Sequence, residues 1–347
     1  MTIGAFSRAT GLSPGALRFY SDSALLSPHS VDTSSGYRYY THDQIERAVT
    51  IRRLRETGMP LDAISRVLGG DVETIAQHLT NLIDEVGRAR RTAADLHGAS
   101  DTESRKNVLT LNGPVFAAAI DQILGATGHH PDHPVLGGVY VETAGSVMTL
   151  TATDRFRLAT RTVVVEQSDS GNLSAGDLTA VIDGDDLRAA LPAIRARHRV
   201  QMAFGDSGVV FGPDTPFCRT LTEQFPDYRS MLESLPAVVT RVVVERSELT
   251  KAIEDHQGQY LSLVVTDGTL RVSALGSGDA TDVRAVVSGP DVELAFAMTT
   301  LYPAITPVVG PELMLDVSGP NMPVVIRSAD DGDLTTLAMP IDADGVE

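Results

Sequence analysis

The spacing of apolar residues changes character once along this chain, and that change constrains the fold more than any other feature. Up to residue 97, apolar side chains recur mostly at steps of three and four, which places them on one face of a helix. From residue 107 they alternate with polar side chains in short runs, as in strands with one buried face. The segment 98–106 between these parts is small, polar and aperiodic. The sequence therefore predicts a multidomain protein with a helical head, a linker and an α+β C-terminal part.

Charge is divided unevenly between the two parts. Residues 1–106 carry 13 basic and 13 acidic side chains, whereas the rest of the 347-residue chain carries 15 and 32 and holds the whole net charge of −17. Only the head can therefore be drawn to phosphate by its overall charge. The single cysteine, Cys218, excludes an intramolecular disulfide and a cysteine-built zinc site. No segment approaches membrane-spanning length.

The first residues carry the helix start and stop signals of a helix-turn-helix. A short helix over residues 3–9 is stopped by Gly11. Ser13 and Pro14 then supply the N-cap and first-turn proline of a second helix through Tyr20. Two short helices around a tight glycine turn form a motif that places its second helix in the major groove of DNA.

A run of alternating aromatic and basic residues follows Gly36 and predicts a β-ribbon wing beside these helices. Arginine can neutralise phosphate or bind guanine, and hydroxyl groups can donate to the DNA backbone. The residues predicted to contact DNA are Ser13, Arg18, Tyr20, Tyr37 and Arg38. The neighbouring Phe19, Tyr39 and Tyr40 are expected in the core of the head instead.

These strings match one known family in order and spacing. Residues 1–70 resemble the winged-helix head of MerR-family regulators, through Thr2-Ile3-Gly4, Gly11-Leu12-Ser13, Leu17-Arg18-Phe19-Tyr20, Gly36-Tyr37-Arg38-Tyr39-Tyr40 and Ile51-Arg52-Arg53-Leu54 with Gly58. The resemblance implies a domain that binds double-stranded promoter DNA.

Residues 71–97 form a predicted amphipathic helix that cannot bury its apolar stripe alone. The stripe consists of Val72, Ile75, Leu79, Leu82, Ile83, Val86, Ala89 and Ala93. In MerR-like proteins such a helix pairs antiparallel with its twin, which implies a homodimer that binds a two-fold symmetric operator. The alternative is a helix packed on its own C-terminal part. No cysteine lies nearby, so metal sensing by thiolates is excluded.

The C-terminal part contains an internal repeat. A predicted helix at 115–124 precedes a hairpin at 138–153, and a predicted helix at 247–255 precedes a hairpin at 261–274. In each unit a further strand and a second helix follow. The sequence therefore predicts two tandem α+β domains.

Three strings in register identify this repeat. They are Ala152-Thr153-Asp154-Arg155-Phe156-Arg157-Leu158-Ala159, Phe225-Pro226-Asp227-Tyr228-Arg229 and Leu337-Ala338-Met339-Pro340-Ile341. They resemble the second and third domains of the bacterial sliding clamp, the β subunit of DNA polymerase III. The first clamp domain is missing, and the MerR-like head stands in its place.

Together, the two resemblances predict five segments. They are a DNA-binding domain at 1–70, a dimerisation helix at 71–97, a linker at 98–106, and clamp-like domains at 107–235 and 236–347.

In sliding clamps the junction of these two domains forms an apolar groove that receives short peptide motifs. Carried over by motif, the groove residues here are Leu136, Thr153, Arg155, Phe156, Arg157, Leu158, Pro226, Met231, Leu337, Met339, Pro340 and Ile341. The alternative is that these residues serve packing alone. The family usually ends in a basic residue, whereas the segment after Ile341 is acidic, so peptides with acidic flanks are less favoured.

Two further functions are not expected. The predicted helices of the C-terminal part carry few basic residues, so this part is not expected to encircle DNA. The cluster His129-His130-Pro131-Asp132-His133 lies in a proline-rich loop and is interpreted as solvated rather than metal-binding. No catalytic motif is present, and neither enzyme activity nor a cofactor is assigned.

The leading hypothesis is a cytoplasmic, nucleoid-associated transcription regulator whose groove replaces the usual sensor. The effector would be a clamp-binding peptide or a clamp-directed small molecule, and no membrane partner is expected. The alternative is a DNA-tethered platform that recruits replication or repair proteins through the groove. A true processivity clamp would need the missing domain and a basic lining.

Overall fold

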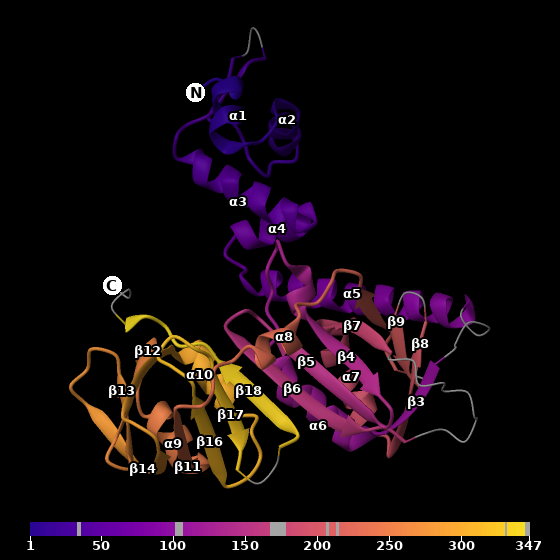
Figure 1. Ribbon diagram of the computed structural model, residues 1–347. Coiled ribbons are helices and arrows are strands. Elements are labelled where there is room, and N and C mark those ends of the chain that lie inside the picture. Colours follow the sequence, from indigo (N-terminus) through magenta and orange to yellow (C-terminus); the bar gives the residue numbers. More distant parts are fainter. Residues whose placement is uncertain are drawn as a thin grey trace. The chain divides into compact units, whose positions relative to one another are not determined.

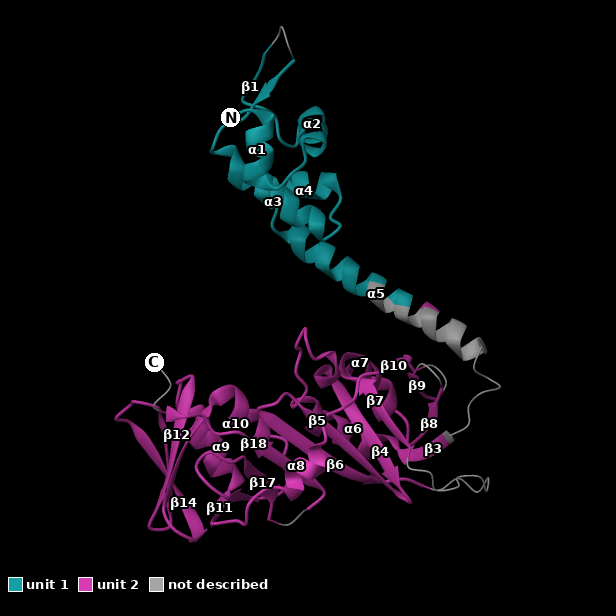
Figure 2. Ribbon diagram, turned by 45° about the horizontal axis from the view of Figure 1, so that its top comes forward, with its two compact units in different colours: residues 1–90 teal, residues 91–347 magenta. Residues whose placement is uncertain are grey.

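The computed structural model describes residues 1–32, 36–100, 107–166, 178–205, 208–212, 215–329 and 332–343. It separates into two compact units, Met1–Arg90 and Arg91–Glu347, shown in different colours in Figure 2. Among the described residues, no helix combines the length and the apolar character needed to cross a membrane. Each unit has its own hydrophobic core, so each is described separately.

The first unit begins with the predicted helix-turn-helix. Its elements are α1 (Ile3–Thr10), α2 (Pro14–Asp22), β1 (Ser30–Val31), β2 (Arg38–Tyr39), α3 (Gln44–Glu56), α4 (Leu61–Leu68) and α5 (Glu73–Ser100). Gly11 ends α1 in the left-handed region with φ 73°, and Ser13 Oγ accepts a hydrogen bond from the Ala16 amide at 3.1 Å to start α2. These local signals explain why α1 ends and α2 begins where they do, although α1 runs one residue and α2 two residues further than the sequence predicts.

The core of the head is built around two stacked rings. Phe6 of α1 and Tyr40, which follows the wing, stack with centroids 4.4 Å apart and an interplanar angle of 14°. Leu17 and Tyr20 of α2 are buried with them, as is Ile51 of α3. The wing strands β1 and β2 pair antiparallel, with Ser30 opposite Tyr39.

The core prediction is confirmed for one of three aromatic residues and wrong for the other two. Tyr40 is 1% exposed, but Phe19 is 56% exposed and Tyr39 is 38% exposed. Successive residues of an extended strand point to opposite sides, so Tyr39 and Tyr40 cannot share one environment. In α2 the inward positions are taken by Leu17 and Tyr20, which turns Phe19 toward solvent.

Helix α5 continues to Ser100, into the segment predicted to be a linker. Residues 101–106 of that linker lie outside the described residues. At its N-terminal end α5 is joined to the head, because Ile75 packs against the head core and the His78 ring bonds to the Thr57 carbonyl at 3.1 Å.

The second unit contains two series of elements in the same order. The first comprises β3 (Asn107–Asn112), α6 (Gly113–Leu124), the short 3-10 helix η1 (Pro134–Gly137), β4 (Gly138–Ala144), β5 (Val147–Thr153), β6 (Arg157–Val164), β7 (Thr179–Asp183), α7 (Gly184–Arg195), β8 (Arg199–Phe204), β9 (Gly208–Phe211), β10 (Cys218–Leu221) and α8 (Tyr228–Glu233). The second comprises β11 (Thr240–Glu245), α9 (Arg246–Glu254), β12 (Tyr260–Thr266), β13 (Thr269–Ala274), β14 (Ala280–Ser288), β15 (Val292–Ala297), α10 (Met298–Ile305), β16 (Glu312–Val317), β17 (Val324–Ser328) and β18 (Leu334–Ala338). Apart from η1 and α8, the two series match, as the predicted repeat requires.

Strand pairing joins the two halves of the second unit. Within the described ranges, sixteen strands form one hydrogen-bonded order, in which β18 of the second half lies beside β6 of the first (Figure 1). In that antiparallel pair Leu337 is opposite Leu158. Helices α6 and α7 pack against each other, and α6 also packs on β5 and β6, so that the sheet and helices enclose the core. This arrangement confirms the α+β tandem-domain prediction.

Candidate DNA-binding surface and clamp-like groove

The predicted DNA contacts lie on α2 and the wing, but their accessibilities differ. Arg18 is exposed and forms no ion pair with any described side chain, and Tyr37 is 48% exposed. Tyr20 is only 7% exposed and packs in the head core, so any DNA contact is limited to its accessible edge. Ser13 is engaged as the N-cap of α2. DNA contact by these residues remains a prediction.

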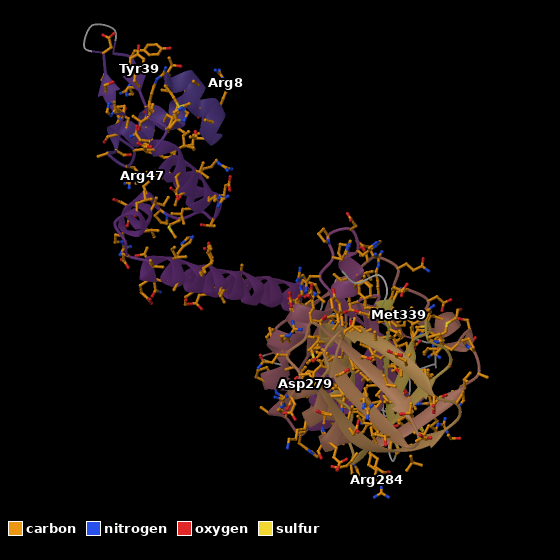
Figure 3. All side chains as sticks on the ribbon, turned by 90° about the vertical axis from the view of Figure 1, so that its left-hand side faces the viewer. Arg8, Tyr39, Arg47, Asp279, Arg284 and Met339 are labelled. Carbon is orange, nitrogen blue, oxygen red and sulfur yellow. The ribbon has the colours of Figure 1, made fainter. Side chains whose placement is uncertain are left out.

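Arg38 joins the wing to the second helix. Its Nη2 atom is 2.8 Å from Asp22 Oδ1, and its Nε donates to Ser21 Oγ at 3.2 Å. Tyr39 beside it and Arg8 of α1 are labelled on the head in Figure 3. Because two groups at the C-terminal end of α2 hold the Arg38 guanidinium, the wing is fixed relative to that helix.

The structure brings four of the predicted groove residues into one apolar cluster. Leu136 in η1, Leu158 in β6 and Leu337 in β18 are 3%, 5% and 2% exposed, and Met231 of α8 packs against them. These residues come from four distant parts of the chain. The cluster therefore depends on the β6–β18 pairing that joins the two domains.

The turn before β6 and the first residue of that strand carry three more predicted groove residues, Arg155, Phe156 and Arg157. The Asp154 carboxylate accepts hydrogen bonds from the amides of Phe156 at 3.0 Å and Arg157 at 2.7 Å, and it also pairs with the Arg157 guanidinium. Arg155 has φ 82°, in the left-handed region that favours glycine, and its guanidinium contacts the ring of His133. In this tight turn the Phe156 ring is 63% exposed, two residues before Leu158 of the cluster.

The remaining predicted groove residues have different environments. Thr153 is buried and donates to the Arg157 carbonyl at 2.7 Å, whereas Pro226 is exposed. The amide of Met339, labelled in Figure 3, donates to the Phe156 carbonyl at 2.9 Å, so the C-terminal segment and the turn are joined directly. Pro340 is buried, and the Ile341 amide bonds to Ala295 of β15.

Glu142 of β4 makes a structural contact that the sequence did not indicate. It accepts hydrogen bonds from the Tyr228 hydroxyl and from Arg229 Nη2, the latter at 2.7 Å, and thereby attaches α8 to the sheet. Burial and the hydrogen bond to Glu142 raise the pKa of Tyr228 to about 12. A cavity of about 500 Å³ lies beside this contact, between β7 and the segment that precedes α8. The only available sequence signal was the Tyr228-Arg229 pair within the clamp-like motif.

The histidine loop makes polar contacts of its own. His129 Nε2 lies 3.2 Å from Asp185 Oδ2. Burial raises the pKa of Asp185, but its hydrogen bonds to His129 and Arg188 outweigh burial and hold that pKa below its ordinary value. Over the described ranges, no three His, Cys, Asp or Glu side chains are grouped to hold a metal ion.

The basic side chains near α7 are largely paired with acids. Arg188 pairs with Asp185 at 2.7 Å, and Arg195 pairs with Asp121 of α6. These ion pairs reduce the charge available for phosphate. That this unit does not encircle DNA stays a prediction.

Comparisons with known proteins define the class to which this arrangement belongs. Residues 1–70 match the MerR HTH family regulatory protein model, and residues 110–227 match the central domain of the DNA polymerase III beta subunit. An HTH-type transcriptional regulator of Pseudomonas aeruginosa, PA4778, is 33% identical over 109 residues, which cover 28% of this chain and 82% of that protein. The chain thus joins a helix-turn-helix head to a clamp-like module, the name used below for residues 107–347. Through its head it belongs to the MerR HTH family of regulatory proteins.

The clamp-like module has relatives of its own. The beta sliding clamp of Streptomyces coelicolor is 27% identical over 231 residues, which cover 62% of this chain and 60% of that clamp. A solved Pseudomonas aeruginosa sliding clamp bound to griselimycin has a TM-score of 0.61 at 18% identity, over 70% of this chain and 67% of that one. The chain therefore spans less than two thirds of the length of the curated clamp that it matches, and the structural likeness establishes the fold.

Proposed function

We propose that this protein is a homodimeric transcription regulator whose clamp-like module binds a peptide or a clamp-directed small molecule and transmits that binding to the DNA-binding head. One observation carries the proposal: a single chain joins a MerR head to a module in which Leu136, Leu158 and Leu337 form an apolar cluster at the domain junction. A regulator needs a sensor, and the module stands where a sensor would be.

The exposed stripe of α5 supports a dimer. Leu79 is 51% exposed and Ile83, one turn later, is 71% exposed. Each apolar side chain of this size gains about 1.5–3 kcal/mol when it is fully removed from water, so a second copy of the helix is the expected cover. Antiparallel pairing of two copies makes a symmetric dimer, which suits a two-fold symmetric operator.

The exposed edge of the apolar cluster supports ligand binding. Phe156 is 63% exposed and lies two residues before the buried Leu158, so its ring offers apolar surface that a ligand would remove from water. A clamp of the same fold has been solved bound to griselimycin, and we propose that this module accepts a ligand of that kind or a short apolar peptide.

Coupling to DNA follows from the two-state behaviour that the MerR resemblance implies. Such heads act by distorting promoter DNA, and the energy of that distortion depends on the conformation of the dimer. A ligand that binds one conformation better shifts the population toward it. In this scheme the ligand acts without touching DNA.

The test is a footprint of the full-length protein on the DNA upstream of its own coding region, with and without griselimycin and a generic clamp-binding peptide. We expect a footprint that changes when ligand is added and a Phe156→Ala variant whose footprint forms but no longer responds. A ligand that binds without changing the footprint would instead indicate a DNA-tethered platform. Failure of the protein to protect any DNA would reject the regulator.

A further inference from the structure

Phe19 is exposed on the surface of the head where an apolar ring is unfavourable. In the described part of the chain, the exposed large aromatic side chains are Phe19, Tyr37, Tyr39 and Phe156. Tyr37 and Tyr39 carry hydroxyl groups that water can hydrate, and their rings lie 5.9 Å apart on the wing. Phe19 has no polar atom for water to hydrate, so its exposed ring offers a purely apolar contact to a partner.

The surroundings of Phe19 leave room for a close approach. Gly15 precedes it by one helical turn, and a Cβ built on Gly15 would meet only Ser13 Oγ, at 3.8 Å. The face of α2 next to the ring is therefore bare backbone. The printed ring contact of Phe19 is a tilted one with Tyr20, with centroids 5.9 Å apart, and this leaves most of the ring open.

The charges next to Phe19 favour DNA as that partner. Arg18 precedes it on α2 and is exposed. Asp22 lies on the same helix one turn later. Its negative charge is offset by Arg38, whose Nη2 atom is 2.8 Å from Asp22 Oδ1. An apolar ring next to an exposed arginine on the second helix of a helix-turn-helix matches the major groove, where phosphates border the base edges.

Only one base offers an apolar group in that groove. Thymine presents its C5 methyl group, whereas the other base edges present donors and acceptors that a phenyl ring cannot satisfy. We propose that Phe19 recognises thymine in the operator by packing its ring against that methyl group. This inference rests on the proposed DNA-binding function and adds a base preference to it.

The experiment replaces single thymines of the footprinted operator by uracil, which removes only the methyl group. At one position in each half-site we expect the wild-type affinity to fall about fourfold, the effect of one buried methyl group. Phe19→Ala should bind the thymine operator more weakly and show no further loss with uracil. Phe19→Leu, which keeps an apolar side chain, should retain part of the discrimination.

Arg18→Ala is the matched control. It should weaken binding to the thymine and uracil operators equally and flatten the salt dependence, because it removes a cation from the predicted DNA-binding surface. Equal wild-type affinity for every uracil operator would overturn the proposal, as would a Phe19→Ala variant that keeps the discrimination. If Phe19→Ala changes the molecular mass in light scattering and leaves the discrimination intact, then the ring covers a protein contact. Absence of any operator would reject the proposed function itself, which is a separate result.

Discussion

Arg38 of the wing and Asp22 of α2 form an ion pair with 2.8 Å between Nη2 and Oδ1. The pair spans the two elements of the head that the sequence assigns to DNA, and Ser21 adds a second contact to the same guanidinium. Their relative position is therefore set before DNA binds.

We expect Arg38→Ala to lower DNA affinity about tenfold, because it removes a cation and releases the wing. Exposed ion pairs contribute about 0–1 kcal/mol, so the melting temperature of the head should change little. Fluorescence anisotropy on an operator fragment and calorimetry would measure the two effects. Arg271→Ala removes a comparable exposed pair with Asp282 in the clamp-like module and should leave DNA binding unchanged.

Ala24 is in the left-handed region with φ 55°, a conformation that costs a non-glycine residue about 1–2 kcal/mol. Ala24→Gly removes this strain but increases the entropy of the unfolded chain, so we expect a net gain of about 0.5 kcal/mol. The calorimetric transition of the head should move upward. Ala16 lies inside α2 and has ordinary helical geometry. Ala16→Gly should therefore lower the free energy of unfolding of the head by about 1 kcal/mol and move the same transition downward. A lower melting temperature for both variants would show that Ala24 is not strained.

The exposed stripe of α5 predicts the oligomeric state. Ile83→Asp places a charge where the partner helix would pack, and we expect the mass measured by light scattering to fall from dimer to monomer. Asn81→Asp adds the same charge to the same helix away from Leu79 and Ile83, and it should remain dimeric. A wild-type protein that is already monomeric would remove the basis for the proposed symmetric operator.

The environment of Tyr228 predicts that its phenol titrates at strongly alkaline pH. Its pKa is raised to about 12, by burial first and then by the hydrogen bond to Glu142. The protonated phenol is favoured in the folded state, so its contribution to stability is complete below the unfolded pKa of about 10 and is lost as the pH rises to 12. The difference in ultraviolet absorbance between wild type and Tyr228→Phe should show this midpoint.

Removal of the Glu142 charge should lower that midpoint, because the acceptor that stabilises the protonated phenol becomes neutral. We therefore expect Glu142→Gln to shift the Tyr228 titration toward 10. Glu233→Gln on the same helix, α8, is the control and should leave the titration in place. An unchanged midpoint in Glu142→Gln would show that burial alone raises the pKa.

Substitutions at buried and at exposed groove residues should have different effects on stability and on ligand binding. Leu158→Ala opens a cavity in the packed cluster and should destabilise the clamp-like module by about 2–5 kcal/mol. Phe156→Ala removes an exposed ring and should weaken griselimycin or peptide binding, measured by calorimetry, with little change in stability. Neither variant should alter DNA affinity in the absence of ligand. Full ligand affinity in Phe156→Ala would place the ligand elsewhere.

Local chemistry explains what the sequence by itself determined. The helix-turn-helix was predictable because Gly11 and Ser13 act on neighbouring backbone groups, and the repeat was predictable because strand and helix periods differ. The family motifs, such as the turn at Asp154, are also contiguous strings. These signals need no knowledge of distant residues, and the fold they predict is confirmed.

The tertiary structure alone decided which side chains are accessible and which distant groups meet. Phe19 and Tyr20 are adjacent and similar in sequence, yet the first is 56% and the second 7% exposed, because helix packing selects one face. Glu142 holds Tyr228 from 86 residues away, and no local pattern encodes that contact. Such pairings are set by strand order and by the exclusion of water from the cores. These are properties of the whole folded chain.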